Sequence, residues 1–274
     1  MQPLILGLGV GFPISPEEEL LTAKRVGFDG VFTGWSGRGS LTEITRIIRR
    51  EGMRYQSVHA PFGNVHKLWE EGDEGEEEVK NQILCLEDCA RAEVPIAVMH
   101  AIIGFERHTP NATGSERFGR IFRRAGELGI SVAVENTEGE EYLERLLCDH
   151  KDAHVGFCID TGHELCYNEG RDMIGKYASR LIATHLNDNL GVTGNEITWH
   201  DDAHLLPFDG IADWTGIARR LKAAGYGGEL TTELVTKNKP NRHTHDRYEA
   251  LSPEEYLRAA RERLLRIRSL LDGE

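Results

Sequence analysis

The sequence predicts a single-domain α/β protein, a (β/α)8 TIM barrel that spans residues 1–274, and three observations predict it. Short apolar runs alternate with amphipathic stretches from one end of the chain to the other, and eight such pairs can be counted. No proline- or serine-rich linker and no shift of composition divides the 274 residues. Finally, eight parallel strand–helix units fit in roughly 250 residues, which is the size of one closed barrel.

Each expected strand is a short apolar run that is followed by a stretch able to form a helix. The eight strand candidates are Leu4–Gly9, Gly30–Thr33, Tyr55–His59, Ile96–His100, Ser131–Glu135, Val155–Asp160, Leu181–His185 and Glu229–Glu233. We therefore expect eight neighbouring parallel strands.

Two of the expected helices open on the same four residues, Ser-Pro-Glu-Glu, at Ser15 and at Ser252. Serine can cap the helix, proline suits its first position, and the third-position glutamate can reach back to the cap nitrogen. The final helix has apolar residues at helical spacing, which predicts one stripe that packs on the barrel. These residues are Leu257, Ala260, Leu264, Ile267 and Leu271.

The charge and composition restrict the class of protein. A net charge of −13 disfavours binding through a broad basic surface and is ordinary for a soluble enzyme of small molecules. No apolar run approaches the roughly 18 residues of a membrane span, and the N-terminus lacks a signal-peptide pattern, so we expect a cytoplasmic protein. The five cysteines include no C-x-x-C pair, which argues against a disulfide framework or a cysteine zinc finger. The sequence leaves the oligomeric state open between a monomer and a homo-oligomer.

Six of the eight strand candidates end on a side chain that can bind a metal ion. The carboxyl ends of the strands surround the active site of a β/α barrel, so these side chains are expected to converge on its mouth. They are His59, His100, Glu135, Asp160, His185 and Glu233.

Strand parity is consistent with this convergence, because residues two apart share a face of a strand. If Glu135 points into the barrel, Ala133 does too, and Val132 and Val134 point at the helices. Three further candidate ligands, His163, Asp202 and His204, lie just beyond the strands. A mixture of imidazole and carboxylate suits zinc, manganese or iron better than magnesium. The sequence therefore predicts a divalent-metal site at the mouth.

With these residues identified, the chain resembles the xylose isomerase-like barrel superfamily, which includes sugar isomerases, ketose 3-epimerases and the endonuclease IV group. The resemblance covers nearly the whole chain. It rests on SVHAPFG at Ser57–Gly63, VENTEG at Val134–Gly139, CIDTGH at Cys158–His163, THLNDN at Thr184–Asn189 and DDAHLLPFDG at Asp201–Gly210.

The resemblance to the sugar isomerases and epimerases implies that Glu135, Asp160, His185 and Glu233 bind one metal ion. The two glutamates would be acid and base. When the metal holds a hydroxyl and a carbonyl oxygen of a ketose, one glutamate would remove a proton to give an enediolate and the other would return it. His163 would hydrogen-bond the sugar. The implied substrate is a small sugar or sugar phosphate of carbohydrate metabolism.

The resemblance to the endonuclease IV group implies an alternative, the incision of DNA at abasic sites with three zinc ions. All nine ligands of that group have counterparts here, and Phe62 takes the position of an aromatic residue near DNA. The loops at residues 9–13 and 34–39 do not resemble the polar and basic DNA-contacting loops of that group, which favours a sugar. Between one and three metal ions are therefore expected. The nine counterparts are His59, His100, Glu135, Asp160, His163, His185, Asp202, His204 and Glu233.

Other residues near the expected mouth have two interpretations. Trp35 and Phe62 could stack on a sugar ring or simply roof the barrel. Asn187 could bind substrate or support the ligands. The basic segment Lys237–Arg247 could receive a phosphate group or be a solvated loop. His200 could be a further ligand or a loop residue.

The other histidines, outside the ligand pattern, are expected mostly at the surface; they are His66, His108, His150, His154, His243 and His245. A third class of function, a barrel that only binds, is disfavoured because both glutamates are present.

Overall fold

The structure, a computed structural model, describes residues 1–106 and 109–273. It confirms the predicted barrel. The eight strands follow the sheet order β7-β6-β5-β4-β3-β2-β1-β8, and all seven neighbouring pairs run parallel. The strands are β1 (Leu4–Gly7), β2 (Gly30–Gly34), β3 (Arg54–His59), β4 (Ile96–His100), β5 (Ser131–Glu135), β6 (Val155–Asp160), β7 (Leu181–His185) and β8 (Leu230–Thr232).

The barrel is nearly closed where β7 meets β8. The backbone N–H of Leu186 donates to the carbonyl oxygen of Thr231 at 2.7 Å, just past the end of β7. The backbone N–H of Thr231 donates in turn to Oγ1 of Thr184 at 3.3 Å. A side-chain hydroxyl thus completes the seam between the first and last strands of the sheet order.

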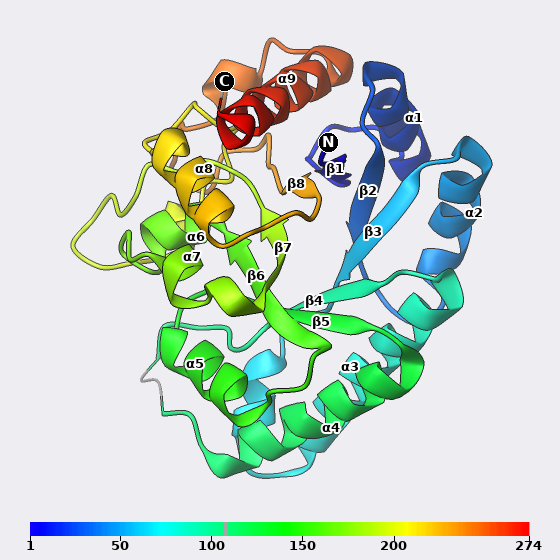
Figure 1. Cartoon of the computed structure of the whole chain (residues 1–274), viewed down its shortest axis with the longest axis vertical. Helices are drawn as coiled ribbons and strands as arrows, with labels where there is room; N and C mark the ends of the chain where they lie inside the picture. The colour runs from blue at the N-terminus through cyan, green and yellow to red at the C-terminus, as the bar shows by residue number, and fades with distance from the viewer. Residues whose placement is uncertain (107–108, 274) are drawn as a thin grey trace.

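The helices surround the strands, as Figure 1 shows. The α-helices are α1 (Pro16–Val26), α2 (Leu41–Glu51), α3 (Asp73–Ala92), α4 (Ala112–Leu128), α5 (Glu140–Asp149), α6 (Thr161–Cys166), α7 (Met173–Lys176), α8 (Trp214–Ala223) and α9 (Pro253–Asp272). Short 3-10 helices are η1 (Val65–Trp69), η2 (Ala178–Arg180), η3 (Trp199–Asp201) and η4 (Asp246–Tyr248).

Both predicted Ser-Pro helix starts are present. Oγ of Ser15 accepts from the N–H of Glu18 at 3.1 Å, and Oγ of Ser252 accepts from the N–H of Glu255 at 3.3 Å. Glu255 also reaches back to the N–H of Ser252 at 2.8 Å, which completes a capping box. The predicted stripe of α9 is entirely buried.

The first and last strands are shorter than expected. β1 ends at Gly7, because Gly9 has a φ of 96°, outside the extended region. β8 ends at Thr232, so Glu233 lies one residue beyond its strand. The other five strand-end ligands do end their strands.

The strand parity is as expected, because the two sides of the barrel wall belong to different apolar clusters. Val132 and Val134 pack in the large cluster between the strands and the helices. Ala133 packs instead in a small cluster inside the barrel, together with Val98, Cys158 and Ala183. These short side chains fill the interior just below the mouth, so the larger polar side chains at the strand ends have a packed floor.

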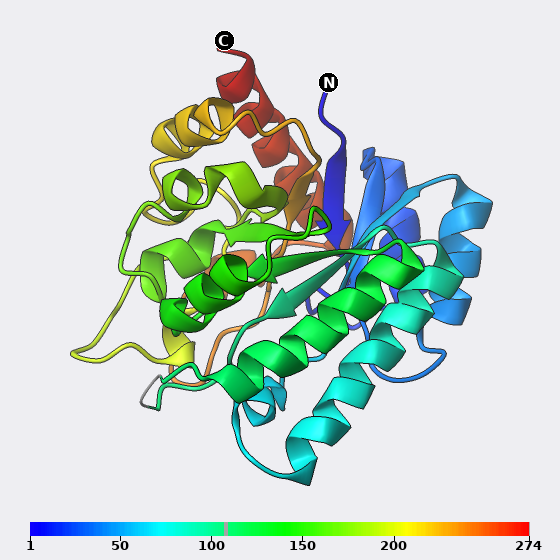
Figure 2. The same cartoon turned by 60° about the horizontal axis from the view of Figure 1, so that its bottom comes forward.

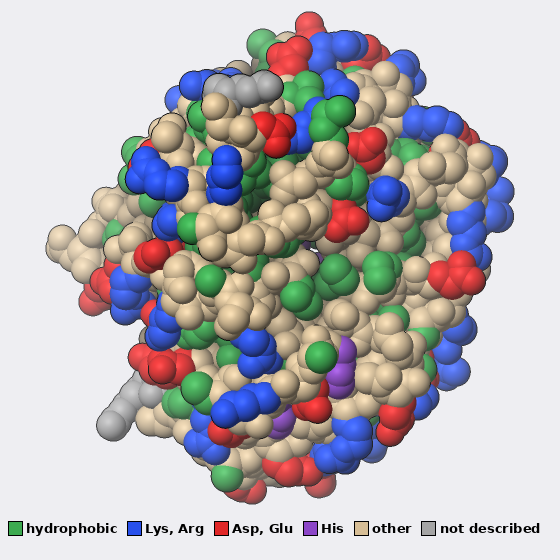
Figure 3. All heavy atoms as spheres, in the orientation of Figure 1, with side chains coloured by type: hydrophobic (Ala, Val, Ile, Leu, Met, Phe, Trp, Pro, Cys, Tyr) green, Lys and Arg blue, Asp and Glu red, His purple; other side chains and the backbone are tan. Residues whose placement is uncertain are grey.

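The chain termini lie together at one end of the barrel, as Figure 2 shows. On the face shown in Figure 3, lysine and arginine side chains alternate with aspartate and glutamate, and neither sign forms a continuous patch. Among the described residues, no helix combines the length and the apolar character that crossing a membrane requires.

Candidate metal centre

The structure brings all nine predicted ligands to the mouth of the barrel, where they form overlapping groups. The first group consists of His59, His100 and Glu135, from the ends of β3, β4 and β5. Oε2 of Glu135 lies 3.3 Å from Nε2 of His59 and 3.1 Å from Nε2 of His100. Phe62 covers this group, with its ring stacked on His100 at a centroid distance of 4.6 Å.

The second group is central and contains the four residues expected to bind one metal, Glu135, Asp160, His185 and Glu233. Nδ1 of His185 lies 2.6 Å from Oε1 of Glu135 and 3.0 Å from Oε2 of Glu233. The imidazole of His185 stacks on Phe32 of β2 at a centroid distance of 4.8 Å, which fixes its plane. Glu135 therefore belongs to both groups and uses one oxygen in each.

The third group consists of Asp160, His163 and His204, and Asp202 adjoins it. Nε2 of His204 lies 3.0 Å from Oδ2 of Asp202, and Nε2 of His163 lies 3.5 Å from Oδ1 of the same carboxylate. Oδ1 of Asp160 also caps α6, because it accepts from the N–H of His163 at 2.7 Å. Asp160 therefore links the central group to the third.

Backbone carbonyls fix the orientation of three imidazoles. Nδ1–H of His59 donates to the carbonyl of Ala60 at 2.8 Å, and Nδ1–H of His163 donates to that of Asn136 at 2.9 Å. His204 does the same to the carbonyl of Glu233 at 3.1 Å. In each ring Nε2 is then the nitrogen that faces a carboxylate.

This arrangement fits a divalent metal ion. A neutral imidazole with Nδ1–H offers only a lone pair at Nε2, and a lone pair facing a carboxylate oxygen requires a cation between them. Three buried atoms of the site, Nδ1 of His100, Nε2 of His185 and Oδ1 of Asp202, also have no hydrogen-bond partner in the described part of the chain. A mixed nitrogen and oxygen donor set of this kind suits zinc, manganese or iron.

Without a metal, protons take the place of that cation. Burial alone would raise the pKa of Glu135, but His185, His100 and His59 outweigh it and hold this pKa well below its ordinary value. Burial would lower the pKa of His204, but Asp202 raises it to about 9. Glu135 is thus ionised and the imidazole of His204 is protonated. Metal binding must displace such protons.

Two asparagines hold the central aspartate. Oδ1 of Asn136 accepts from the backbone N–H of Asp160 at 2.7 Å, and Nδ2 of Asn187 donates to Oδ2 of Asp160 at 2.6 Å. A Cβ atom at Gly162 would lie 2.0 Å from Oδ1 of Asn187, so glycine permits this close approach. Asn187 is completely buried and is absent from the cavity lining. The structure therefore places it as a support of the ligand, and not where the expected contact with substrate would be.

Trp35 also lies elsewhere than expected. Its indole N–H donates to Oδ2 of Asp88 on α3 at 2.7 Å, and its ring is buried in the core between strands and helices. The sequence placed Trp35 correctly on the loop after β2 but could not give the direction of its ring, which points away from the mouth.

A cavity of about 460 Å3 opens above the ligands. Six of the nine ligands line it. They are His59, His100, His163, Asp202, His204 and Glu233. Phe62, which is 42% exposed, lines it as expected. Sequence reasoning placed Lys239 in the basic segment expected at the mouth, but it missed the other lining residues, Ile103, Gly104, Phe105, Glu138, Tyr167 and Trp199. Most lie on loops without a periodic pattern, although Glu138 stood within the VENTEG motif.

The remaining histidines divide between surface and interior. His245 is completely buried, against expectation, because its Nε2–H donates to the carbonyl of Ala203 at 2.8 Å and fixes the loop that carries the ligands Asp202 and His204. His200 belongs to none of the donor groups found among residues 1–106 and 109–273. His108 lies outside the described residues.

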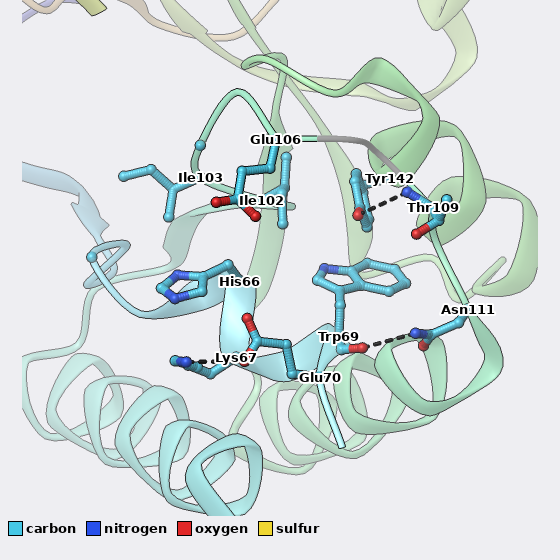
Figure 4. A pocket seen from close by; sticks show the side chains of 12 residues that line it. His66, Lys67, Trp69, Glu70, Ile102, Ile103, Glu106, Thr109, Asn111 and Tyr142 are labelled. Carbon is cyan, nitrogen blue, oxygen red and sulfur yellow. Dashed lines mark hydrogen bonds and ion pairs between the residues drawn. The ribbon is translucent and has the colours of Figure 1, made fainter. Parts of the chain in front are cut away.

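A second cavity of about 680 Å3 lies beside the first and shares Ile103 and Gly104 with it. Figure 4 shows His66, Lys67 and Trp69 from η1 facing Ile102 and Glu106 of the loop after β4. None of the nine ligands lines it. The larger cavity is therefore separate from the metal centre.

Imidazole and carboxylate donors at the strand ends place this chain in the class of (β/α)8 barrels whose mouths carry side chains able to bind a divalent metal ion. Within that class, the chain belongs to the xylose isomerase-like TIM barrel family, whose sequence profile matches residues 20–267.

Two relatives illustrate the range of this family. The uncharacterized protein y4fM of Sinorhizobium fredii is 28% identical, and the match covers 82% of this chain and 78% of the relative. A probable endonuclease 4 of Methanoculleus marisnigri is 32% identical, but this match covers only 44% of this chain and 51% of the relative.

Solved structures share the fold at low identity. A D-tagatose 3-epimerase-like protein superposes with a TM-score of 0.75 at 18% identity, over 99% of this chain and 98% of the other. An IOLI protein solved with a zinc atom gives a TM-score of 0.75 at 16% identity, over 97% of this chain and 98% of the other.

Proposed function

We propose that this chain is a metal-dependent isomerase or epimerase of a small sugar. The observation that carries the proposal is that the central donor group, Glu135, Asp160, His185 and Glu233, opens through Glu233 onto a cavity of about 460 Å3. Cavities of that size hold small molecules. The aromatic side chains that line it, Phe62, Phe105, Tyr167 and Trp199, suit the apolar face of a sugar ring.

The proposed roles differ from those expected from the sequence. A bound divalent ion would polarise the oxygens of the sugar and make the neighbouring C–H more acidic. Glu135, Asp160 and His185 would hold that ion. Both oxygens of Glu135 are in contact with histidines, and its side chain is 0% exposed, so we assign it to binding the metal and not to proton transfer.

Glu233 is the proposed base, because its side chain is 26% exposed and lines the cavity. It would take the proton from the carbon next to the carbonyl and return it. A single base suffices for the carbon-bound proton of an isomerisation, which moves between neighbouring carbons on one face while a second proton moves from the hydroxyl oxygen to the former carbonyl oxygen. An epimerisation needs a second group on the opposite face, and Glu138 is a further glutamate in the cavity lining.

The proposal is tested by proton exchange. Metal-loaded protein is incubated in D2O with a panel of ketoses and aldoses, and deuterium at carbon is measured by NMR. We expect incorporation with at least one sugar, and we expect Glu233→Gln to abolish it while the metal content stays the same. If no sugar exchanges, or if Glu233→Gln exchanges at the wild-type rate, the proposed function is wrong.

A second candidate, the incision of DNA at abasic sites, is favoured by one specific observation. The complete set of nine ligands is gathered in three overlapping groups, and an isomerase needs only the central one. Phosphodiester hydrolysis can use several metal ions at once. About three zinc ions per chain, together with metal-dependent incision of a duplex that contains one abasic site and no exchange into sugars, would replace the first proposal by this one.

A further inference from the structure

Two loops form one wall of the metal cavity, and one of them carries a charged side chain to which no role is assigned above. They are the loop between β7 and α8, residues 186–213, and the loop between β8 and α9, residues 233–252. The first contributes Trp199, which is 49% exposed, and the second contributes Lys239. Among the described residues that line the cavity, Lys239 is the only lysine or arginine.

The ammonium group of Lys239 lies close to the metal ligands. Its Nζ is 4.0 Å from Oδ2 of Asp202 and 5.3 Å from the centroid of the Trp199 ring. The side chain is only 20% exposed. No acceptor within hydrogen-bonding distance of this Nζ is found in the part of the chain that the structure describes. A strong donor therefore faces the cavity without an acceptor from the described residues.

Asp202 does not fully neutralise the positive charge of Lys239. Nε2 of His204 lies 3.0 Å from Oδ2 of Asp202, and Nε2 of His163 lies 3.5 Å from Oδ1, both nearer than the lysine. When a divalent ion occupies these donors, Lys239 becomes a like charge beside it. Asp202 offsets this repulsion only in part, because its single negative charge faces both cations, and a second anion bound between them would complete the compensation.

The loops hold Lys239 in place. Nη2 of Arg242 lies 3.4 Å from Oδ1 of Asp201, which joins the two loops to each other. The side chain of Asn238, next to Lys239, accepts from the backbone N–H of His245 at 2.7 Å. Asp201 is itself bound by the hydroxyl of Thr193 at 2.6 Å. Lys239 therefore lies on a loop that is held in place by hydrogen bonds and an ion pair, and not on an unrestrained surface loop.

We propose that Lys239 is a specificity-determining residue that binds an anionic group of the substrate, a phosphate or a carboxylate. The substrate class is then an anionic sugar, either a sugar phosphate or a sugar acid, whose ring packs on Trp199. The sugar part of this inference rests on the proposed function, whereas the recognition of an anion rests on the geometry of Lys239 alone.

The test is a binding measurement on zinc-loaded protein by calorimetry. The probes are inorganic phosphate, D-fructose, D-fructose 6-phosphate and D-galacturonate. The variants are Lys239→Met, which removes the charge, and Lys239→Arg, which keeps it. Lys237→Met is the matched control, because Lys237 is exposed, lies on the same loop and is absent from the cavity lining.

We expect Lys239→Met to weaken the binding of inorganic phosphate and of one anionic sugar by roughly 10- to 100-fold, the effect of a lost charge-assisted hydrogen bond. Binding of D-fructose should be unchanged, and Lys239→Arg and Lys237→Met should both retain anion binding. Tighter binding of fructose 6-phosphate than of galacturonate identifies a phosphate as the anionic group, and the reverse order identifies a carboxylate.

The inference is overturned if anions bind Lys239→Met as tightly as the wild type, since they would then bind through the metal alone. It is also overturned if the variant loses fructose and anions equally, which indicates a damaged wall. The proposed isomerase activity fails by a different measurement, the absence of deuterium exchange, so the two failures are distinguishable.

Discussion

Glu135 at the end of β5 and His185 at the end of β7 face each other across β6, with Oε1 of the glutamate 2.6 Å from Nδ1 of the histidine. The other oxygen of Glu135 faces His59 and His100. A single buried carboxylate therefore joins two donor groups, whereas Glu233 joins only the central group and reaches the cavity.

The two glutamates should therefore respond differently to the same substitution. Glu135→Gln removes the shared anionic ligand, so we expect metal affinity to fall by more than roughly 100-fold, the upper range for mere supporting residues. Glu233→Gln should keep most of the metal and lower turnover by roughly 10²–10⁴-fold, the contribution of a positioned acid or base. Metal content by plasma mass spectrometry and turnover, measured on both variants, check this. Equal metal loss in both would contradict the assignment.

Asn187→Ala should weaken the metal site without removing a ligand. Asn187 donates to Oδ2 of Asp160 at 2.6 Å, and within the described part of the chain its loss leaves that carboxylate held only through Oδ1, by the backbone N–H of His163. We expect metal affinity to fall roughly 10- to 100-fold. At saturating metal, the KM of the substrate should be unchanged. A raised KM with intact metal binding would show instead that Asn187 contacts the substrate, the other alternative that the sequence suggested.

Trp35→Phe should affect stability alone. The indole N–H of Trp35 donates to the buried carboxylate of Asp88, which also accepts from the backbone N–H of Gly39 and pairs with Arg91. Leaving the carboxylate one donor short should cost about 1–3 kcal/mol of unfolding free energy. Urea denaturation measures this cost, with metal content as the control. A change in sugar binding instead would place Trp35 at the mouth.

Removal of the metal should lower the melting temperature, because the ion binds the folded state alone. At a free metal concentration 100 times the Kd, the loss should be on the order of 5–10 °C. Scanning calorimetry before and after chelation, and again after zinc or manganese is returned, measures it. An unchanged melting temperature would indicate that the donor groups hold no ion.

The gain in melting temperature on metal binding should also depend on pH, and the protonation of His204 determines the direction of this dependence. Its folded pKa of about 9 lies above the ordinary 6.5, so its proton stabilises the metal-free protein fully below pH 6.5 and this contribution is lost as the pH rises through 9. Bound metal requires the unprotonated ring. The gain in melting temperature on adding metal should therefore be larger at pH 9 than at pH 6.5. A gain that shrinks with rising pH would contradict this assignment.

The sequence was informative where chemistry and periodicity coincide. His100, Glu135 and Asp160 end apolar runs of the right length, so their convergence follows from the barrel alone. The position of Ala133 inside the barrel follows from alternation with Val132 and Val134, and the structure confirms it.

Side-chain direction on irregular loops could not be predicted in this way. The loops that bear Trp35 and Trp199 both follow strands, yet one indole is drawn to Asp88 in the core and the other lies half exposed over the cavity. What decides between them is a partner distant in the chain, and no local pattern encodes that partner. The same holds for His245, which is buried because the carbonyl of Ala203 accepts a hydrogen bond from its Nε2–H.

The anchors of His59, His163 and His204 are main-chain carbonyls and not side chains. Substituting the anchoring residue cannot delete its carbonyl, so only a shift of the backbone can release these rings. Mutational drift can therefore alter the rim, including Trp199 and Lys239, while the orientation of the imidazoles persists. In a lineage of such barrels, the substrate specificity can therefore change far more easily than the geometry of the metal-binding imidazoles.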